Sequence, residues 1–316
     1  MPPILSILPQ EHHETNRTMR RKSIQSDNKI VNPQHVVIRK KRKPCCSSCS
    51  CFLMFLMGLF LLTSALYFLY PSRTNILILG LDYADFDSTI ARSDTIIVST
   101  FVPLEPYVGI LSIPRDLWVV IPNIGENRIN TAHFFAESQT PGSGPQATID
   151  TIKLNMGVTI PYYIRIKFNG FIEVVDTLGG IEIEIPEAMA GYPAGKHYLN
   201  GKKALAFARS REYADDFQRM QQAQILIKTL LKNFLFPRNW ARLPSVANAA
   251  FKAVDTNIPI WLYPRIGLSI LRAGPSGFDS RVIDREMVTP YITEQGAAVL
   301  LPNWEAIYGL IDEMFH

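Results

Sequence analysis

Three nearly continuous apolar runs come early in the chain, separated by short charged or proline-containing breaks. They cover residues 75–81, 95–101 and 107–113. Runs without polar alternation are typical of strands that are buried on both faces of a sheet. The turn from Pro103 to Pro106 joins the last two runs, which predicts a hairpin beside the first strand.

Helix and strand patterns alternate in the remainder of the chain. The pattern predicts helices at 146–155, 170–178 (closed by Gly179-Gly180) and 201–207, and strands at 162–168 and 181–185. A longer helix from Asp216 to Phe234 has one apolar stripe, formed by Phe217, Met220, Ile227, Leu231 and Phe234. Weaker signals predict helices at 241–254, 262–272 and 304–315 and a strand at 297–301. The fold class expected is α/β (α+β-like), with a central mixed β-sheet flanked by helices.

An uncharged segment at residues 52–70 predicts a transmembrane anchor, assigned to 50–71. Nineteen residues at helical rise span roughly 28 Å, about the thickness of a bilayer's hydrocarbon core. Tyr67 and Tyr70 lie near one end, where aromatic side chains favour the membrane interface. A cleaved signal peptide would have a shorter apolar region and a small-residue cleavage site, which the sequence lacks here.

The distribution of charge predicts the orientation of that anchor. Residues 1–44 contain ten basic side chains, and only Arg73 follows the anchor closely. The positive-inside rule therefore predicts a single-pass cell-membrane protein with a cytoplasmic, disordered tail (1–49) and an extracytoplasmic domain. The whole chain has 32 basic and 28 acidic residues, of which the tail holds ten basic and three acidic. Without the tail and Arg73, 21 basic and 25 acidic residues remain, so the outer domain is mildly acidic. A nucleic-acid partner is not expected.

The four cysteines, Cys45, Cys46, Cys49 and Cys51, all lie at the inner end of the anchor. The outer domain therefore has no disulfide and depends on its core. The spacing is compatible with a metal or acylation site, but an incidental role at the membrane edge is favoured because neither histidine nor carboxylate flanks the cluster closely.

Charged residues stand at the ends of the three predicted strands. They are Asp82, Arg92 and Asp94, and Arg115 and Asp116. If the second strand runs antiparallel to the other two, all five converge at one edge of the sheet, where open sheets place ligands. Paired carboxylates beside arginines suit a divalent cation on a phosphate. The alternative is a set of separate strand-end ion pairs.

A second charged cluster follows the helix at 201–207. It contains Arg209, Arg211, Asp215, Asp216 and Arg219. Arginine matches oxyanions with a planar fork of donors, so the cluster predicts a phosphate site. Arg209 and Arg211 face the same side only if the helix breaks near Ala208, which is therefore expected. The alternative is a solvated helix start with an Asp216–Arg219 pair.

Six motifs in order resemble the LytR–CpsA–Psr family of cell-envelope phosphotransferases, over residues 75–236. They are Asn-Ile-Leu-Ile-Leu-Gly-Leu-Asp, Ala-Arg-Ser-Asp-Thr-Ile-Ile-Val, Leu-Ser-Ile-Pro-Arg-Asp-Leu, Arg-Ile-Asn-Thr-Ala-His, Val-Asp-Thr-Leu-Gly-Gly-Ile and Leu-Asn-Gly-Lys-Lys-Ala-Leu-Ala-Phe-Ala-Arg-Ser-Arg. The family often has Ile-Asn-His-Ala where this chain has Ile129-Asn130-Thr131-Ala132-His133, which puts a polar role for His133 in doubt. Residues 237–316 form an extension beyond the resemblance, expected to pack on the same domain.

The resemblance implies transfer of a glycan phosphate from a polyprenyl-pyrophosphate-linked glycan to a cell-wall acceptor, usually peptidoglycan. Asp82 and Asp94 would hold Mg²⁺, with Mn²⁺ as the alternative metal. The residues implied around the pyrophosphate are Arg92, Arg115, Arg209, Arg211 and Arg219, with Gln222 also binding substrate. The lipid tail of the substrate would lie in an apolar tunnel beside the long helix. Membrane lipids are a further expected partner.

Two other functions remain open from the sequence. With water as the acceptor, the same residues would make a polyprenyl-pyrophosphate hydrolase. A non-enzymatic envelope regulator would bind lipid and signal through the basic tail. Asp116 is a candidate general base, although the adjoining Arg115 stabilises its ionised form and makes it a poor proton acceptor.

Overall fold

The computed structural model describes residues 47–70, 72–81, 91–210 and 216–315. Helix α1 (Ser47–Leu69) contains the predicted apolar segment, and Ser50–Leu69 is long and apolar enough to cross a membrane. The predicted disordered tail lies outside the described residues up to residue 46. Residues 56–316 form one compact unit, which contains the domain that follows the apolar segment.

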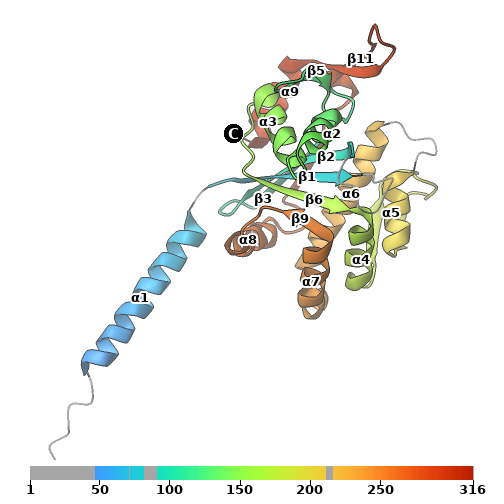
Figure 1. Ribbon diagram of the computed structural model, residues 1–316. Helices are drawn as coiled ribbons and strands as arrows, with labels where there is room; N and C mark the ends of the chain where they lie inside the picture. The colour runs from blue at the N-terminus through green and yellow to red at the C-terminus, as the bar shows by residue number, and fades with distance from the viewer. Residues whose placement is uncertain (1–46, 71, 82–90, 211–215, 316) are drawn as a thin grey trace, which may run out of the picture. The chain divides into compact units, whose positions relative to one another are not determined.

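A mixed sheet of six strands organises the domain (Figure 1). In spatial order its strands are β10 (Phe278–Val282), β3 (Tyr107–Ile113), β2 (Ser93–Val102), β1 (Thr74–Leu81), β6 (Tyr162–Lys167) and β9 (Val254–Thr256). Strand β2 pairs antiparallel with both β1 and β3, whereas β6 and β10 join in parallel. The predicted mixed sheet and the hairpin of β2 and β3 are therefore confirmed.

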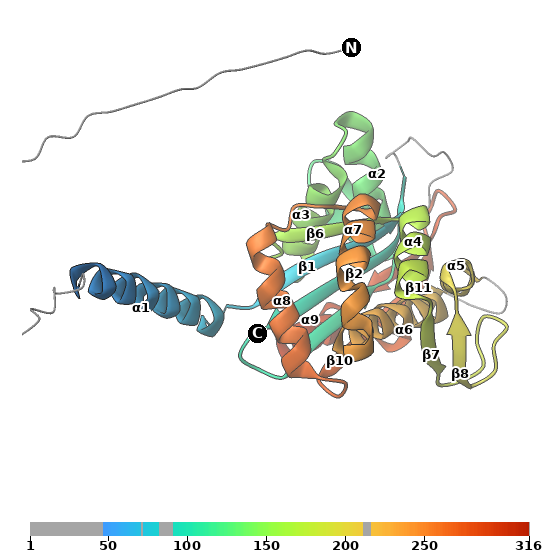
Figure 2. The ribbon, with the colours of Figure 1, turned by 90° about the horizontal axis from the view of Figure 1, so that it is seen from below.

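Helices cover both faces of this sheet, which explains the apolar runs. Alternate residues of β1 point to opposite faces: Leu77 and Leu79 pack in one core cluster, and Ile76 and Ile78 in another. The first face carries α2 (Asn130–Gln139), α3 (Gly144–Met156) and α9 (Trp304–Phe315). The second carries α6 (Asp216–Leu235) and α8 (Tyr263–Ala273), with α4 (Phe168–Leu178) and α7 (Leu243–Ala253) on the same side (Figure 2).

Three small hairpins and a short helix complete the domain. The hairpins are β4 (Trp118–Ile121) with β5 (Gly125–Arg128), β7 (Ile181–Ile185) with β8 (Gly195–Leu199), and β11 (Val288–Ile292) with β12 (Ala298–Pro302). The strand predicted at 181–185 is therefore confirmed as β7, and it belongs to a separate two-stranded sheet. Helix α5 (Gly201–Arg209) begins at Asn200, whose side chain accepts a hydrogen bond from the Lys203 amide at 2.9 Å.

Residues 237–316 pack in the same core as the rest of the domain, as expected. They contribute β9 and β10 to the central sheet and α9 to the first core cluster. Short 3-10 helices, η1 (Pro237–Arg242), η2 (Ile260–Leu262) and η3 (Arg285–Met287), connect these elements. Residue 236 is therefore not the boundary of a structural unit.

Candidate functional site

The strand directions bring charged residues together at one edge of the sheet. Asp94 stands near the start of β2, and Arg115 follows the end of β3, which runs the opposite way. The Nη1 atom of Arg115 lies 3.2 Å from Oδ1 of Asp94. Both side chains are partly exposed, so the pair is open to a ligand.

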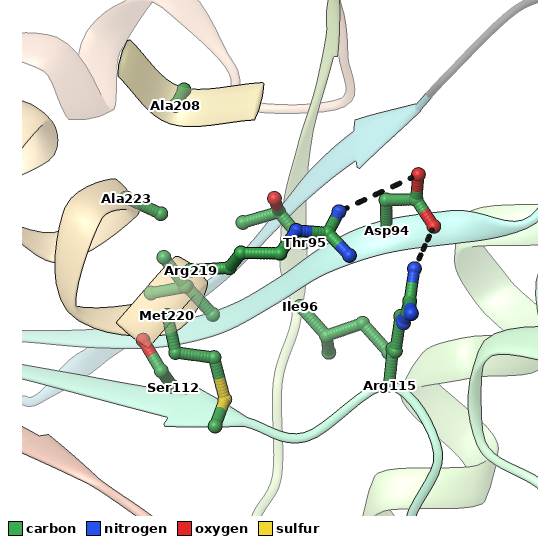
Figure 3. Close-up of a pocket in the computed structure, with 10 residues that line it drawn as sticks. Asp94, Thr95, Ile96, Ser112, Arg115, Ala208, Arg219, Met220 and Ala223 are labelled. Atoms are coloured by element: carbon green, nitrogen blue, oxygen red, sulfur yellow. Dashed lines mark hydrogen bonds and ion pairs between the residues drawn. The ribbon is translucent and has the colours of Figure 1, made fainter. Parts of the chain in front are cut away.

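Arg219 reaches the same carboxylate from helix α6 (Figure 3). Its Nη2 atom lies 3.8 Å from Oδ2 of Asp94, and its side chain is 15% exposed. Arg219 therefore points into the sheet edge, as a phosphate site requires. The side chain of Asp216, its partner in the alternative interpretation, lies outside the described residues.

Asp116 extends this cluster to a third arginine. Its Oδ2 lies 3.3 Å from Nε of Arg115, and its Oδ1 lies 3.4 Å from Nη1 of Arg128. The result is an alternating row in the order Arg219, Asp94, Arg115, Asp116, Arg128. Arg128 was not predicted as a site residue, although it is the first residue of the Arg-Ile-Asn motif, whose charge was a usable signal.

The row borders a charged pocket, and an apolar cavity adjoins that pocket. The charged pocket is lined by Asp94, Thr95, Ile96, Ile97, Ser112, Arg115, Ala208, Arg219, Met220 and Ala223. The apolar cavity is lined by Ile78, Gly80, Thr95, Ile166, Phe171, Leu205, Ala208, Ala223, Leu226 and Ile227. Three residues, Thr95, Ala208 and Ala223, line both, so the two spaces adjoin. The stripe of α6 that carries Ile227 lines the cavity, and it contributes to core as well, since Ile227 and Leu231 pack in the second cluster.

Two buried polar side chains, one of which lines this pocket, have atoms with no hydrogen-bond partner in the described part of the chain. They are the amide oxygen and nitrogen of Gln222 on α6 and the hydroxyl of Ser112 on β3. Gln222 is 0% exposed and Ser112 1%. A buried polar group without a partner costs about 1–3 kcal/mol, so such groups often mark ligand sites.

The other predicted site residues are not among those that line the charged pocket. Arg92 is exposed, and its guanidinium carbon lies 5.9 Å from the centre of the Phe134 ring. Arg209 is the exposed last residue of α5, after which Ser210 adopts extended backbone, so the predicted end of the helix near Ala208 is confirmed within one residue. Asp82 and Arg211 lie outside the described residues. Asp82 follows Leu81, which pairs with Ser93 beside Asp94.

A buried ionic network, absent from the sequence predictions, lies behind the start of β2. Glu137 on α2 is fully buried, and its Oε1 lies 3.1 Å from Nη1 of Arg165 on β6. Arg165 also donates through Nε to Asp255 on β9 at 2.9 Å. Glu137 accepts hydrogen bonds from the amides of Gly142 and Gly144, each at 2.9 Å. The network therefore ties α2 to the sheet and to the loop before α3.

His133 connects this network to the segment before Arg92. Its Nδ1 lies 2.9 Å from the Ala91 carbonyl, and its Nε2 lies 3.4 Å from Nη1 of Arg165. Because a guanidinium can only donate, Nε2 must accept, and the proton must sit on Nδ1. Burial, and to a lesser extent the Arg165 charge, lowers the pKa of His133 below its ordinary 6.5. The doubt over a polar role is thus resolved: His133 is a neutral, hydrogen-bonded core residue.

This ring predicts a pH dependence of stability. Because the folded-state pKa of His133 is depressed, the unfolded chain takes up an additional proton below about pH 6.5. The free energy of unfolding should therefore fall as the pH falls from 6.5 towards 5.5, by at most about 1.4 kcal/mol per pH unit from this group. Urea denaturation of the detergent-solubilised chain at several pH values measures the slope. His133→Gln should flatten it, and an unchanged slope would contradict the assignment.

Comparison with known proteins identifies the family. The LytR_cpsA_psr family matches residues 64–299, more than half of the chain. The chain belongs to the LytR_cpsA_psr family. This is the family that the motifs indicated, and the match extends well beyond residue 236.

Two relatives and two solved structures illustrate the similarity. The regulatory protein MsrR of Staphylococcus aureus (strain COL) is 31% identical over 195 residues, 59% of this chain and 57% of that protein. The polyisoprenyl-teichoic acid–peptidoglycan teichoic acid transferase TagV of Bacillus subtilis (strain 168) is 28% identical over 231 residues, 68% and 56% respectively. The chain thus spans little more than half the length of these curated relatives.

The solved structures support the fold. The crystal structure of B. subtilis TagV has a TM-score of 0.63 and 25% identity, covering 77% of this chain and 97% of that one. The structure of TagT bound to LI-WTA has a TM-score of 0.60, with 77% and 89% covered. Its identity is 21%, so it supports the fold alone.

Proposed function

We propose that this protein is a membrane-anchored phosphotransferase that moves a glycan phosphate from a polyprenyl-pyrophosphate carrier to a cell-wall acceptor such as peptidoglycan. The observation that carries the proposal is a charged pocket beside an apolar cavity, with three lining residues in common. A lipid pyrophosphate has the same two parts, an anionic head and an apolar tail. Family membership and the name of TagV agree with this substrate class.

The head of the substrate would displace contacts that now join protein groups to one another. Arg219 and Arg115 are paired with Asp94, and a pyrophosphate between the guanidiniums would offer each a bidentate anion. Fixed positive charge beside the phosphorus stabilises the charge that develops on the leaving phosphate. Gln222 and Ser112 would add hydrogen bonds from side chains that are already buried.

The tail of the substrate would enter between the sheet and helices α4, α5 and α6. The apolar cavity contains side chains from each of these helices and from β1, β2 and β6. Gly80 lines the cavity on β1, and any larger residue there would crowd Thr95, because a Cβ at this position would stand 3.0 Å from Cβ of Thr95. Burial of a tail here would contribute about 25 cal/mol for each Å² of apolar surface removed from water.

A Mg²⁺ ion fits this chemistry through Asp94. Among the described residues no group of three or more His, Cys, Asp or Glu side chains gathers around one point. Mg²⁺ often uses only one or two carboxylates and takes its other ligands from water and phosphate, so Asp94, with Asp82 as second ligand, suffices. When bound, the ion would neutralise charge on the phosphate oxygens. The arginines would then be released from Asp94 to the substrate.

The domain is placed outside the cytoplasm in this proposal. Ten basic residues precede the apolar segment and one follows it closely, as the positive-inside rule requires for a cytoplasmic N-terminus. Protease added to intact spheroplasts should then digest the chain after residue 72. Protection of that part would reverse the orientation.

An assay with a defined polyprenyl-pyrophosphate glycan tests the function. The purified full chain should transfer glycan phosphate to added peptidoglycan, with Mg²⁺ and not in EDTA. Release of the glycan in the absence of acceptor would instead favour the hydrolase. Lipid binding without turnover under all conditions would favour the regulator, in line with the name of the relative MsrR, a regulatory protein.

A bulky side chain in the wall shared by the charged pocket and the apolar cavity tests the proposed lipid site. Ala223→Phe should raise KM for the long-chain lipid at least 10-fold, roughly the effect of 1.4 kcal/mol of lost binding. Ala206→Phe on α5 is the matched control, because Ala206 is exposed and lines neither space. Equal KM values for the two variants would contradict the proposed tail site.

A further inference from the structure

An exposed apolar patch lies on the second face of the domain, away from the charged pocket. Ile260 and Trp261 on η2 are 74% and 67% exposed, and Phe251 on α7 is exposed as well. The Phe251 ring contacts that of Tyr263 edge to face, with centroids 5.7 Å apart. These four residues are called the α7–α8 patch below.

The patch is held rigidly outward by its neighbours. Ile258 and Leu262, which flank Ile260 and Trp261, are both buried in the second core cluster. The main chain of η2 is therefore fixed to the core, and the two large side chains cannot turn inward. Adjoining exposed apolar side chains on a fixed backbone usually mark an interaction surface.

The patch lies next to the point where the chain leaves the apolar segment. Arg265, buried in the first turns of α8, donates through Nη2 to the carbonyl of Tyr70 at 2.6 Å and to the hydroxyl of Ser72 at 3.0 Å. Tyr70 directly follows the candidate span, and Arg265 comes four residues after Trp261, about one helical turn away. From Leu69 to Thr74, the first residue of β1, the chain can extend at most about 18 Å.

We propose that the α7–α8 patch docks on the lipid bilayer that the candidate span crosses, with Trp261 and Ile260 in the interfacial layer. The inference rests on the proposal that Ser50–Leu69 spans a membrane. A short tether and the Arg265 clamp hold η2 close to that membrane. Tryptophan and tyrosine, apolar rings with one polar atom, are enriched at this depth.

Docking would give the domain a defined orientation on the membrane. A single flexible tether would let the domain tumble, whereas a tether plus an adjacent inserted patch removes most of that freedom. The charged pocket would then stay at a constant height above the lipid surface. Residues 237–316 supply every residue of the patch, so this part of the chain would orient the domain on the membrane.

Quenching of tryptophan fluorescence by brominated lipid tests the inference. The full chain would be reconstituted in vesicles of phosphatidylglycerol and phosphatidylethanolamine that contain phosphatidylcholine brominated at acyl carbons 6 and 7. Trp261→Phe should lose most of the quenching seen in the wild type, while the phenylalanine keeps the patch apolar. Trp118→Phe, which removes a tryptophan from β4 on the opposite face of the sheet, should keep it.

The outcomes separate the patch from the anchor. Carbonate washing of the same vesicles shows whether the chain is integrally inserted. Retention of the chain with equal quenching in wild type and Trp261→Phe would overturn the patch and leave the anchor intact, whereas release of the chain would overturn both. Emission from Trp261 that depends on the protein-to-lipid ratio, without quenching, would show a second copy on the patch and also overturn the inference.

Discussion

Arg219→Gln should lower kcat/KM for glycan-phosphate transfer by about 10²- to 10³-fold, the range for loss of one preorganised charge-stabilising group. Arg219 is the arginine that α6 contributes to the charged pocket, and it points at Oδ2 of Asp94 while Arg115 contacts Oδ1 (Figure 3). The neutral amide keeps much of the size of the side chain but supplies no cation to the phosphate. Transfer from the lipid-linked glycan to peptidoglycan, with initial rates at several donor concentrations, measures the effect.

Two further variants make this result specific to the site. Arg219→Lys keeps the charge and loses the planar fork, so its rate should fall between those of wild type and Arg219→Gln. Arg272→Gln removes an arginine on α8 that donates to the Pro103 carbonyl, and its rate should remain that of wild type. Thermal unfolding should show that all three variants are folded. An unchanged rate in Arg219→Gln would remove Arg219 from the proposed mechanism.

Glu137→Ala should lower the free energy of unfolding by about 3 kcal/mol, the lower end of the range for breaking a buried ion pair. The substitution leaves the buried Arg165 without the carboxylate at 3.1 Å and leaves the amides of Gly142 and Gly144 without their acceptor. The lower end applies because Asp255 still pairs with Arg165. Urea denaturation of the detergent-solubilised chain measures the change.

The control for this prediction is a solvent-exposed ion pair on the surface of the same domain. Lys196 and Glu182, on the β7–β8 hairpin, lie 3.8 Å apart and are both more than half exposed. Lys196→Ala should therefore change the free energy of unfolding by less than about 0.5 kcal/mol. Equal effects of the two substitutions would mean that the Glu137 network does not hold α2 to the sheet.

The site was predictable where strand ends carry charge. The sequence shows that Asp94, Arg115 and Asp116 flank apolar runs, and strands that alternate in direction must bring such flanks to one edge. Arg219 was assigned as a member of the charged cluster that follows the helix at 201–207, and that helix ends at Arg209 as expected. Arg128 was missed although it begins the Arg-Ile-Asn motif, and the Glu137–Arg165 pair was missed because its members are 28 residues apart and nothing local marks them.

Periodicity and charge thus determined what each segment would become. Apolar runs of seven residues specified β1, β2 and β3, because both their faces are covered, and the final amphipathic helix was placed at its observed bounds, Trp304–Phe315. The uncharged segment of α1 needed no tertiary information at all, because length and hydropathy alone decide whether a helix can span a bilayer.

Tertiary structure alone decided which distant segments meet. The short strands β9 and β10 have no periodic signal of their own, and they enter the sheet only because β6 and β3 offer unpaired edges. Arg165 is buried in a strand because Glu137 and Asp255, 28 residues before it and 90 after it, neutralise its charge. Likewise, the charged pocket and the apolar cavity lie side by side because α5 and α6 contribute lining residues to both, a relation that depends on packing and not on local pattern.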